Sequence, residues 1–300
     1  MRGAEALATA KGRGRSRLQS LVMATPLLFF SGLLLYLIAW NVYISLENWS
    51  YLVRHPTIVW GQTYVQMFKD IFFRKAFTHS LLLSAGLVAV GNVLGVLLAG
   101  LLYFLPNTQR SVYLSIFLYP LAISMATNGL IWLWLFNPTL GLDWVLAQLH
   151  LPTIGWLNTG TSTFLSLFLV SVWAYTGLAV LFYLAAFMGV EKEVVEAARI
   201  DGAGGLRILF RILLPNSMNG FIVSTALLFL FAFRMFSLPF VMGGGPSNLF
   251  LMTLTEYVMY SFYVSMFSQS GAASTIIAAI AAAIVIPYAL FGIKRWVVRG

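Results

Sequence analysis

The stretch EAARIDGAGGLRILFRILLP, residues 196–215, is a polar island in a strongly apolar chain. The protein has 300 residues, of which 60% are hydrophobic and only 9% are charged. Eight of its 27 Lys, Arg, Asp and Glu residues nevertheless fall between Glu191 and Arg211. A soluble domain of this size carries about a quarter charged residues. Most of this chain is therefore expected to be hidden from water, and the island is expected to be exposed to it.

Six long apolar segments lie on the two sides of the island. They are Leu18–Leu46, Phe77–Leu105, Val112–Phe136, Phe164–Met188, Ser217–Val241 and Gln269–Ile293. Each is long enough to cross a membrane, which takes about 20 mostly apolar residues in a helix. The first is too long for the apolar part of a cleavable signal peptide. The sequence therefore predicts an all-α polytopic membrane protein with six transmembrane helices.

The distribution of basic residues predicts the orientation. With the N-terminus inside, the inner segments hold 13 of the 18 Lys and Arg residues, the outer loops hold four, and Arg234 lies within a span. Because Lys and Arg gather on the cytoplasmic side, both termini are expected there, in a multi-pass protein of the cell membrane. The island between the fourth and fifth spans then faces the cytoplasm.

Several function classes are disfavoured by composition. The chain has no cysteine, and its three histidines show no metal-ligand spacing, so no metal site is expected. No carboxylate pair stands alone in an apolar segment as a catalytic dyad would. The net charge of +9 lies at the ends of the apolar segments, which indicates membrane topology rather than nucleic-acid binding. We expect no catalytic residue in this chain.

The residues of the island predict two short helices separated by glycines. Val194, Ala197 and Ala198 would share one face of the first helix, and Gly202, Gly204 and Gly205 interrupt it. A short helix with small residues on one face can lie in the groove of a partner. From spacing alone, a solvated loop between two spans is an equal alternative.

The identities of the residues add to the spacing. Glu196-Ala197-Ala198, then Gly202, then Ile212 and Leu214-Pro215 stand in an order that resembles the coupling loop of permease subunits in binding-protein-dependent ABC importers. "FRMFSLPFVMGGGP", residues 233–246, and "TYVQMFKDIFFRKAFTHSLLLS", residues 63–84, resemble the carbohydrate branch of that family. The resemblance covers residues 27–296 and leaves out an Arg-rich tail, residues 1–17.

This resemblance implies a single transmembrane domain over residues 18–300, of the type I importer kind, with a cytoplasmic coupling loop at residues 190–216. The loop would dock on an ATPase subunit through Glu196, Ala197, Ala198, Asp201, Gly202, Ile212, Leu214 and Pro215. The implied partners are two ATP-binding subunits, a second permease and an extracytoplasmic binding protein that delivers a sugar. The chain has no GxxxxGK[ST] phosphate loop, so ATP and Mg²⁺ are expected on the partner subunits and no cofactor on this chain.

Five polar or aromatic residues in the spans are candidates for the substrate pathway: Arg234, Trp173, Ser171, Tyr175 and Asn128. An arginine in an apolar segment is expected to face a cavity or a counter-charge. Sugar permeases of this branch commonly have an aspartate where this chain has Ser237, so Arg234 lacks that local partner. Gly91 and Gly95 form a GxxxG pattern, and small residues begin the last span, which favours close helix packing.

Three alternatives stay open. The same machinery would serve a non-sugar solute such as a phosphorylated polyol. A secondary transporter would need coupling-ion groups in the spans and internal repeats, and neither is seen. A membrane scaffold without transport would not need the spacing of the island.

Overall fold

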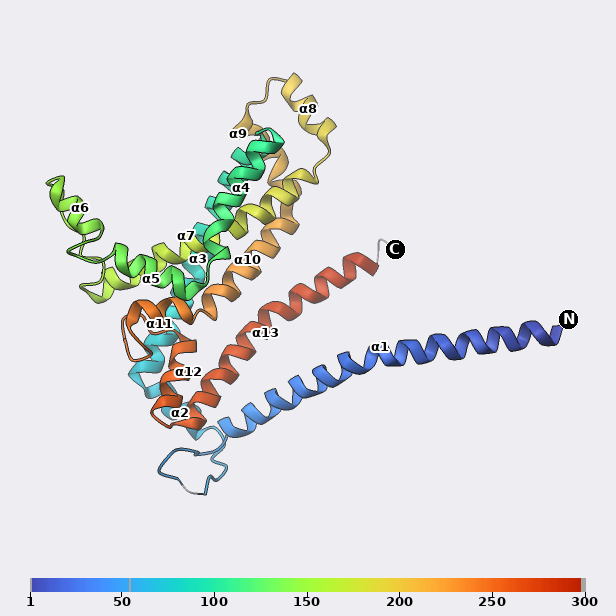
Figure 1. The fold of residues 1–300 in the computed structure, drawn as a ribbon, viewed down its shortest axis with the longest axis horizontal. Helices are drawn as coiled ribbons and strands as arrows, with labels where there is room; N and C mark the ends of the chain where they lie inside the picture. Colours follow the sequence, from blue (N-terminus) through green and yellow to red (C-terminus); the bar gives the residue numbers. More distant parts are fainter. Residues whose placement is uncertain (1, 54, 298–300) are drawn as a thin grey trace.

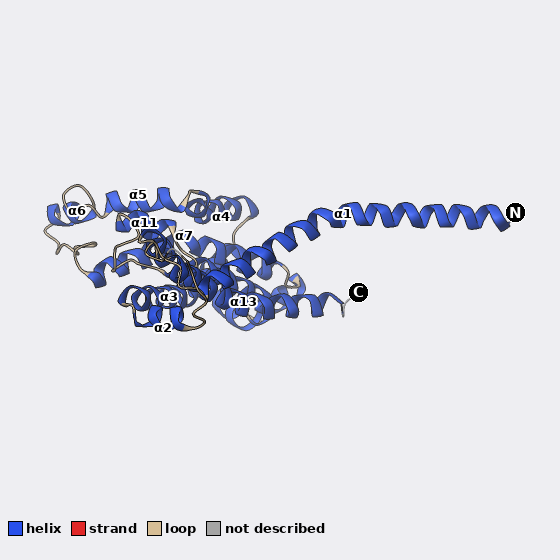
Figure 2. Ribbon diagram, turned by 90° about the horizontal axis from the view of Figure 1, so that it is seen from below, coloured by secondary structure: helices blue, strands red, loops and turns tan. Residues whose placement is uncertain are grey.

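The protein is built of helices, as Figure 2 shows. The computed structural model describes the backbone of residues 2–53 and 55–297 and the side chains of residues 24–53 and 55–287. The basic tail and the last basic residues therefore lie outside the described side chains. Within the described chain, a single isolated bridge between Glu47 and Ile58 is the only β pairing. The helices are α1 Arg2–Ser45, α2 Gln62–Lys69, α3 Ile71–Tyr103, α4 Asn107–Ala122, α5 Met125–Leu135, α6 Leu142–Gln148, α7 Gly160–Met188, α8 Lys192–Ile200, α9 Gly205–Ile208, α10 Met218–Phe233, α11 Ser237–Gly243, α12 Leu254–Tyr263 and α13 Phe267–Val297.

Five helical segments in the described chain are long and apolar enough to cross a membrane. They are Ala24–Ser45, Ile71–Tyr103, Gly160–Met188, Pro215–Gly243 and Phe267–Pro287. The pair α4 and α5 passes the same test together, but the two helices are bent by 93°. The six expected spans are thus found, with one correction. The segment Val112–Phe136 is not one straight helix but two helices with a sharp break.

The break between α4 and α5 has a local cause. Proline removes a backbone donor and disfavours the helix that precedes it, and Pro120 lies in the last turn of α4. Ile123 is extended, and the Ser124 hydroxyl accepts the backbone N–H of Thr127 to start α5. The side-chain amide of Asn128 donates to the Pro120 carbonyl at 2.8 Å. The break is therefore closed by hydrogen bonds within the protein, as an apolar environment requires.

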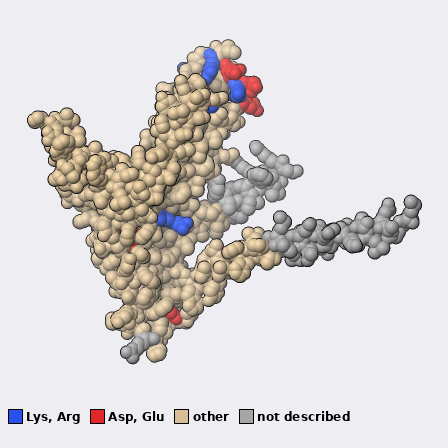
Figure 3. Space-filling view, viewed as in Figure 1, with Lys and Arg blue, Asp and Glu red and all other residues tan. Residues whose placement is uncertain are grey.

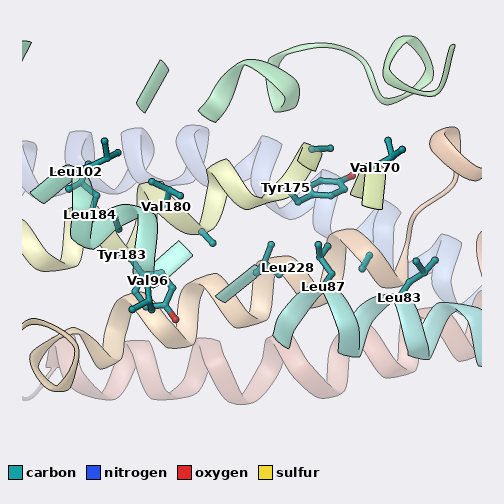
Figure 4. Close-up of a cluster of buried hydrophobic side chains, with 14 of the residues drawn as sticks. Leu83, Leu87, Val96, Leu102, Val170, Tyr175, Val180, Tyr183, Leu184 and Leu228 are labelled. Atoms are coloured by element: carbon teal, nitrogen blue, oxygen red, sulfur yellow. The ribbon is translucent and has the colours of Figure 1, made fainter. Parts of the chain in front are cut away.

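The core lies where α3, α7 and α10 pack together. Figure 4 shows leucine and valine side chains of α3 and α7, such as Leu87 and Val180, meeting there with Leu228 of α10. A Cβ added at Gly95 would lie 2.6 Å from the Cβ of Ala179, and one at Gly91 would lie 3.0 Å from the Leu228 side chain. The close packing expected from the GxxxG pattern is thus confirmed.

One buried amide joins these three helices. The Asn92 side chain donates to Thr225 of α10 at 3.1 Å and accepts the Tyr183 hydroxyl of α7 at 2.9 Å. It also donates to the Val88 carbonyl of its own helix. Both donors and the acceptor oxygen of the amide thus have partners, two of them on other helices, which an amide in an apolar surrounding needs.

Helices α1 and α13 form a second, looser arrangement. They are neighbours at the end of the molecule that carries α2, and both point away from it in the same direction (Figure 1). The Asn41 side chain donates to the Gly271 carbonyl at 3.1 Å and to Thr275 at 3.0 Å, so the small residues expected at the start of the last span do receive a neighbouring helix. Most described side chains of α1 are exposed and apolar, which suits contact with lipid.

Candidate coupling loop and translocation cavity

The coupling loop, residues 190–216, folds as α8, a glycine turn, α9 and a π-helical turn at Leu209–Leu213. Helix α8 ends at Asp201, and Gly202 follows in the left-handed region with φ +78°. The N–H of Gly202 donates to the Arg199 carbonyl, and the N–H of Ala203 donates to the Ala198 carbonyl at 2.9 Å. This pair of bonds is a Schellman cap, in which glycine is preferred because it has no Cβ.

One side of the loop is anchored in the core. Val195, Ile208, Leu209 and Leu213 are all at most 3% exposed. Of the expected face, Val194 and Ala197 are exposed, whereas Ala198 is half-buried and faces inward together with Val195. Docking of the exposed part on a partner stays a prediction. Both sets have helical spacing, and only the position of α3 and α7 decides which is covered.

The loop also rests on the end of α3. The Arg199 guanidinium lies 5.5 Å from the centre of the Phe104 ring, a cation–π contact. A Cβ at Gly100 would lie 2.7 Å from the Leu209 side chain, so this helix and the π turn touch closely. Arg110 donates to the carbonyls of Leu102, Tyr103 and Leu105 and so satisfies the end of α3.

The outer face of the loop is charged and free of covering structure. Glu196, Ala197, Asp201, Gly202 and Pro215 are exposed, whereas Ala198, Ile212 and Leu214 are half-buried. Two large apolar side chains are also exposed, Ile200 at 87% and Leu206 at 71%. Figure 3 shows Lys, Arg, Asp and Glu side chains gathered at the tip that carries α8, on a surface otherwise nearly free of charge. Exposed leucine-type residues beside charges are typical of a protein-binding surface.

A cavity of about 420 Å³ lies at a break in the fifth span. Helix α10 ends at Phe233, and α11 starts only at Ser237. Arg234 lies in this break and lines the cavity together with Tyr175 and Ser237. The Tyr175 ring stacks on Phe231, another lining residue, at 5.4 Å. The Arg234 guanidinium has no hydrogen bond or ion pair with the described residues, as expected from serine at position 237.

The other three pathway candidates lie elsewhere. Ser171 is buried and donates to the Leu167 carbonyl of its own helix. The Trp173 ring meets Trp132 edge to face at 5.4 Å. Asn128 is fully buried at the α4–α5 break. The structure thus places Arg234 and Tyr175 in the lining of one cavity. Ser171, Trp173 and Asn128 do not line it, although Ser171 contacts the sulfur of the lining residue Met235 at 3.5 Å and Asn128 contacts that of Met125 at 3.8 Å. In the described part of the chain, no group of three His, Asp or Glu side chains could hold a metal ion.

Sequence reasoning missed the element that holds this break in place. The Thr253 hydroxyl donates to the Met235 carbonyl at 2.8 Å, directly beside Arg234. Thr253 and Glu256 form a capping box at the start of α12, in which the Glu256 carboxylate accepts the Thr253 N–H at 3.0 Å. The pattern Thr-x-x-Glu in the sequence could have revealed this helix start. Glu256 is 1% exposed, and its burial raises the pKa of its carboxyl to about 8, although hydrogen bonds from Thr253 oppose the rise.

A break within a candidate membrane span, an open cavity with an unpaired cation at that break and an anchored but exposed loop are features that a transport subunit can use. Residues 91–300 match the family described as "Binding-protein-dependent transport system inner membrane component". The chain belongs to this family of permeases and is a multi-pass membrane protein. The family match begins in α3 and includes the whole coupling loop and the cavity.

The similar proteins agree with this assignment. The chain is 52% identical over 281 residues to "Glucose import system permease protein GlcT" of Saccharolobus solfataricus, covering 93% of this chain and 98% of that one. It is 30% identical to "sn-glycerol-3-phosphate transport system permease protein UgpA" of Yersinia pestis, covering 71% and 72% of the two chains. A chain from a crystal structure of a bacterial alginate ABC transporter in complex with its periplasmic protein has the same fold, with a TM-score of 0.76 at 19% identity over 92% of this chain and 94% of that chain.

The buried carboxyl of Glu256 predicts a pH-dependent stability. Because its folded pKa of about 8 lies above its ordinary value of 4.5, the folded state holds the proton more tightly between these values. The contribution of Glu256 to the free energy of unfolding is therefore complete below about pH 4.5. It falls by at most about 1.4 kcal/mol per pH unit as the pH rises from there and is fully lost once the pH has passed through about 8. Thermal unfolding of the purified protein at pH 6 and pH 9 should show a lower Tm at pH 9. Glu256→Gln keeps the capping acceptor and should reduce that difference. An equal difference in both proteins would contradict the assignment to Glu256.

Proposed function

We propose that this chain is a membrane-spanning subunit of an ATP-driven importer that takes up a sugar delivered by an extracytoplasmic binding protein. The observation that carries the proposal is the coupling loop, whose inner side is fixed to α3 and α7 and whose outer side is exposed. The family membership and the 52% identity to a glucose import permease support it. A hexose is accordingly the first substrate to test.

The loop would act as a lever for the spans. Val195 and Leu209 are buried against the core, and Arg199 lies on Phe104 at the end of α3. Two separate ATPase subunits, which would carry ATP and Mg²⁺, would move the loop when they close. Because interiors are close-packed and resist deformation, the movement would pass to α3 and α7 as a rigid displacement. A second, homologous permease would complete the pathway on the other side.

The Arg234 cavity is the proposed place of substrate contact in this chain. A guanidinium offers five N–H donors to hydroxyl oxygens, and aromatic rings such as Tyr175 suit the C–H face of a sugar. A phosphorylated polyol is a second candidate, because Arg234 is an unpaired cation and one relative is named as a glycerol-3-phosphate permease. Competition for uptake by unlabelled glucose and by glycerol 3-phosphate distinguishes the two.

The first test addresses the loop. A Cβ at Gly202 would meet nothing within 4 Å in this chain, but the φ of +78° strains any side chain there, so the control has to carry the same backbone strain. Gly202→Asp should leave the protein in the membrane but abolish substrate-stimulated ATPase activity of the reconstituted transporter. Gly244→Asp, at an equally open site outside the loop with a similar φ of +70°, should preserve it. Normal stimulation in Gly202→Asp would refute docking at this turn.

The second test addresses the cavity. Arg234→Gln should preserve assembly and resting ATPase activity but raise the apparent KM of uptake about tenfold or more, since hydrogen bonds to a charged group contribute about 1.5–3 kcal/mol. Arg234→Lys should restore only part of the loss, because an ammonium lacks the planar fork. Uptake kinetics in proteoliposomes measure both effects. Unchanged KM and rate in Arg234→Gln would make Arg234 a structural residue.

The third test addresses orientation, which we propose to be cytoplasmic for both termini. Single cysteines can be introduced in this cysteine-free chain. Cysteines at Leu52 and Leu149, which are 89% and 64% exposed at the proposed outer end, should react with an impermeant thiol reagent in intact cells. Cysteines at residue 10 and at Ile200, which is 87% exposed in the coupling loop, should react only after lysis. Labelling of either inner position in intact cells would overturn the topology.

A further inference from the structure

A groove separate from the Arg234 cavity lies between the first turns of α3 and α7. Its volume is about 690 Å³, and one wall is a single face of α3 formed by Ile71, Arg74, Lys75, Thr78, His79 and Leu82. The opposite wall is the start of α7, with Gly160, Thr161 and Phe164, and the segment Leu249–Phe250 closes a third side. The spacing of the α3 residues covers three helical turns, about 16 Å.

Charge and apolar surface are separated along this groove. Arg74 and Lys75 lie near the start of α3 and are exposed, whereas Leu82 and Phe164 line it further along the two spans. Neither cation pairs with a carboxylate among the described side chains. The nearby Asp70 carboxylate is already bonded to the Phe72 N–H and the Tyr257 hydroxyl. The groove therefore offers two free positive charges above an apolar wall.

The position of the groove fits the edge of the membrane. Both walls belong to candidate spans, which begin at Ile71 and at Gly160. If the membrane starts where these spans start, the charged part would lie at the level of the lipid headgroups and the apolar part at the level of the acyl chains. The two walls are also fixed to each other, because His79 contacts the Met252 carbonyl at 3.1 Å and its ring packs at a tilt against Phe164, with 5.0 Å between the ring centres.

We propose that this groove binds a phospholipid with an anionic headgroup. The phosphate and headgroup would lie against Arg74 and Lys75, within reach of the Thr78 and Thr161 hydroxyls, and an acyl chain would follow Leu82 and Phe164. A soluble protein's acidic side chain would use the cations but would not reach Leu82, about two helical turns further into the span. A free phosphate ion would leave that wall uncovered.

Lipid binding to the purified full-length chain tests the proposal. After delipidation in detergent, the protein is titrated with phosphatidylglycerol and with phosphatidylcholine of the same acyl chains, and the bound lipids are counted by native mass spectrometry. Wild type should bind one phosphatidylglycerol in preference to phosphatidylcholine. Arg74→Gln combined with Lys75→Gln should weaken that binding about 30-fold, because a cation near an anionic lipid surface contributes about fivefold.

Two variants serve as controls. Lys69→Gln removes an exposed cation of α2 that does not line the groove and should bind as wild type does. Arg74→Lys combined with Lys75→Arg keeps both charges and should retain binding. Because Arg74 and Lys75 are exposed, these substitutions leave the core intact, and Tm values of the delipidated proteins check this.

Four results would overturn the proposal. The first is equal binding of the two lipids, and the second is unchanged phosphatidylglycerol binding in the double Gln variant. The third is an equal loss of binding in Lys69→Gln. The fourth is displacement of the lipid by glycerol 3-phosphate at similar concentration, which would indicate an anion site without a lipid. If the double Gln variant binds the lipid as wild type does but its ATPase activity is no longer stimulated by the binding protein, the groove is a protein-docking surface instead. The proposal is independent of the sugar and of Arg234, so its failure leaves the transport function intact.

Discussion

The close approach of α3 and α7 is the constraint on which the rest of the structure depends. With a Cβ at Gly95 only 2.6 Å from Ala179, the two helices can meet here only because position 95 has no side chain. The approach brings Tyr183 to Asn92, and Asn92 in turn holds Thr225 of α10. In a membrane there is little hydrophobic force between helices, so such contact and buried hydrogen bonds have to supply the association. The coupling loop rests on this pair of helices, and the cavity and the groove open beside it.

The break at Arg234 shows how irregular backbone is tolerated at membrane depth. Unpaired backbone groups in hydrocarbon are costly, so such a break needs partners from the protein. The Thr253 hydroxyl supplies one to Met235, and the same residue is fixed by its capping box with Glu256. The start of α12 is fixed once more by Ser80 of α3, whose hydroxyl accepts the Leu254 N–H at 2.8 Å. The position of Arg234 is thus determined by residues that lie far from it in sequence.

The length of the apolar segments predicted the six spans, and the charge and identity of the residues in between predicted the coupling loop. It did not predict the bend at Ile123–Ser124, although Pro120 marks the place, because proline is tolerated in many membrane helices. It did not indicate that Val195 and Ala198 form the inner face of α8, or that Arg234 and Tyr175 are the pathway candidates that line the cavity. These two gaps share one cause. In a membrane protein, lipid-facing and core-facing residues are equally apolar, so periodicity does not tell which face another helix covers.

The cations in and beside the spans divide into those that the chain itself satisfies and those that it leaves open. Arg110 is bonded to three carbonyls at the end of α3, and Arg199 lies over an aromatic ring. Arg234 and the pair Arg74 and Lys75 have no such partner within the described residues, and each lines a cavity or groove. A charge held in an apolar environment without compensation lowers stability. All three side chains are exposed in this chain, so the cost applies to them only where a partner subunit or lipid covers them, and the two sites differ in what they offer. One has three aromatic rings in its lining, those of Tyr175, Phe231 and Phe236, and the other combines two cations with the apolar side chains of Leu82 and Phe164.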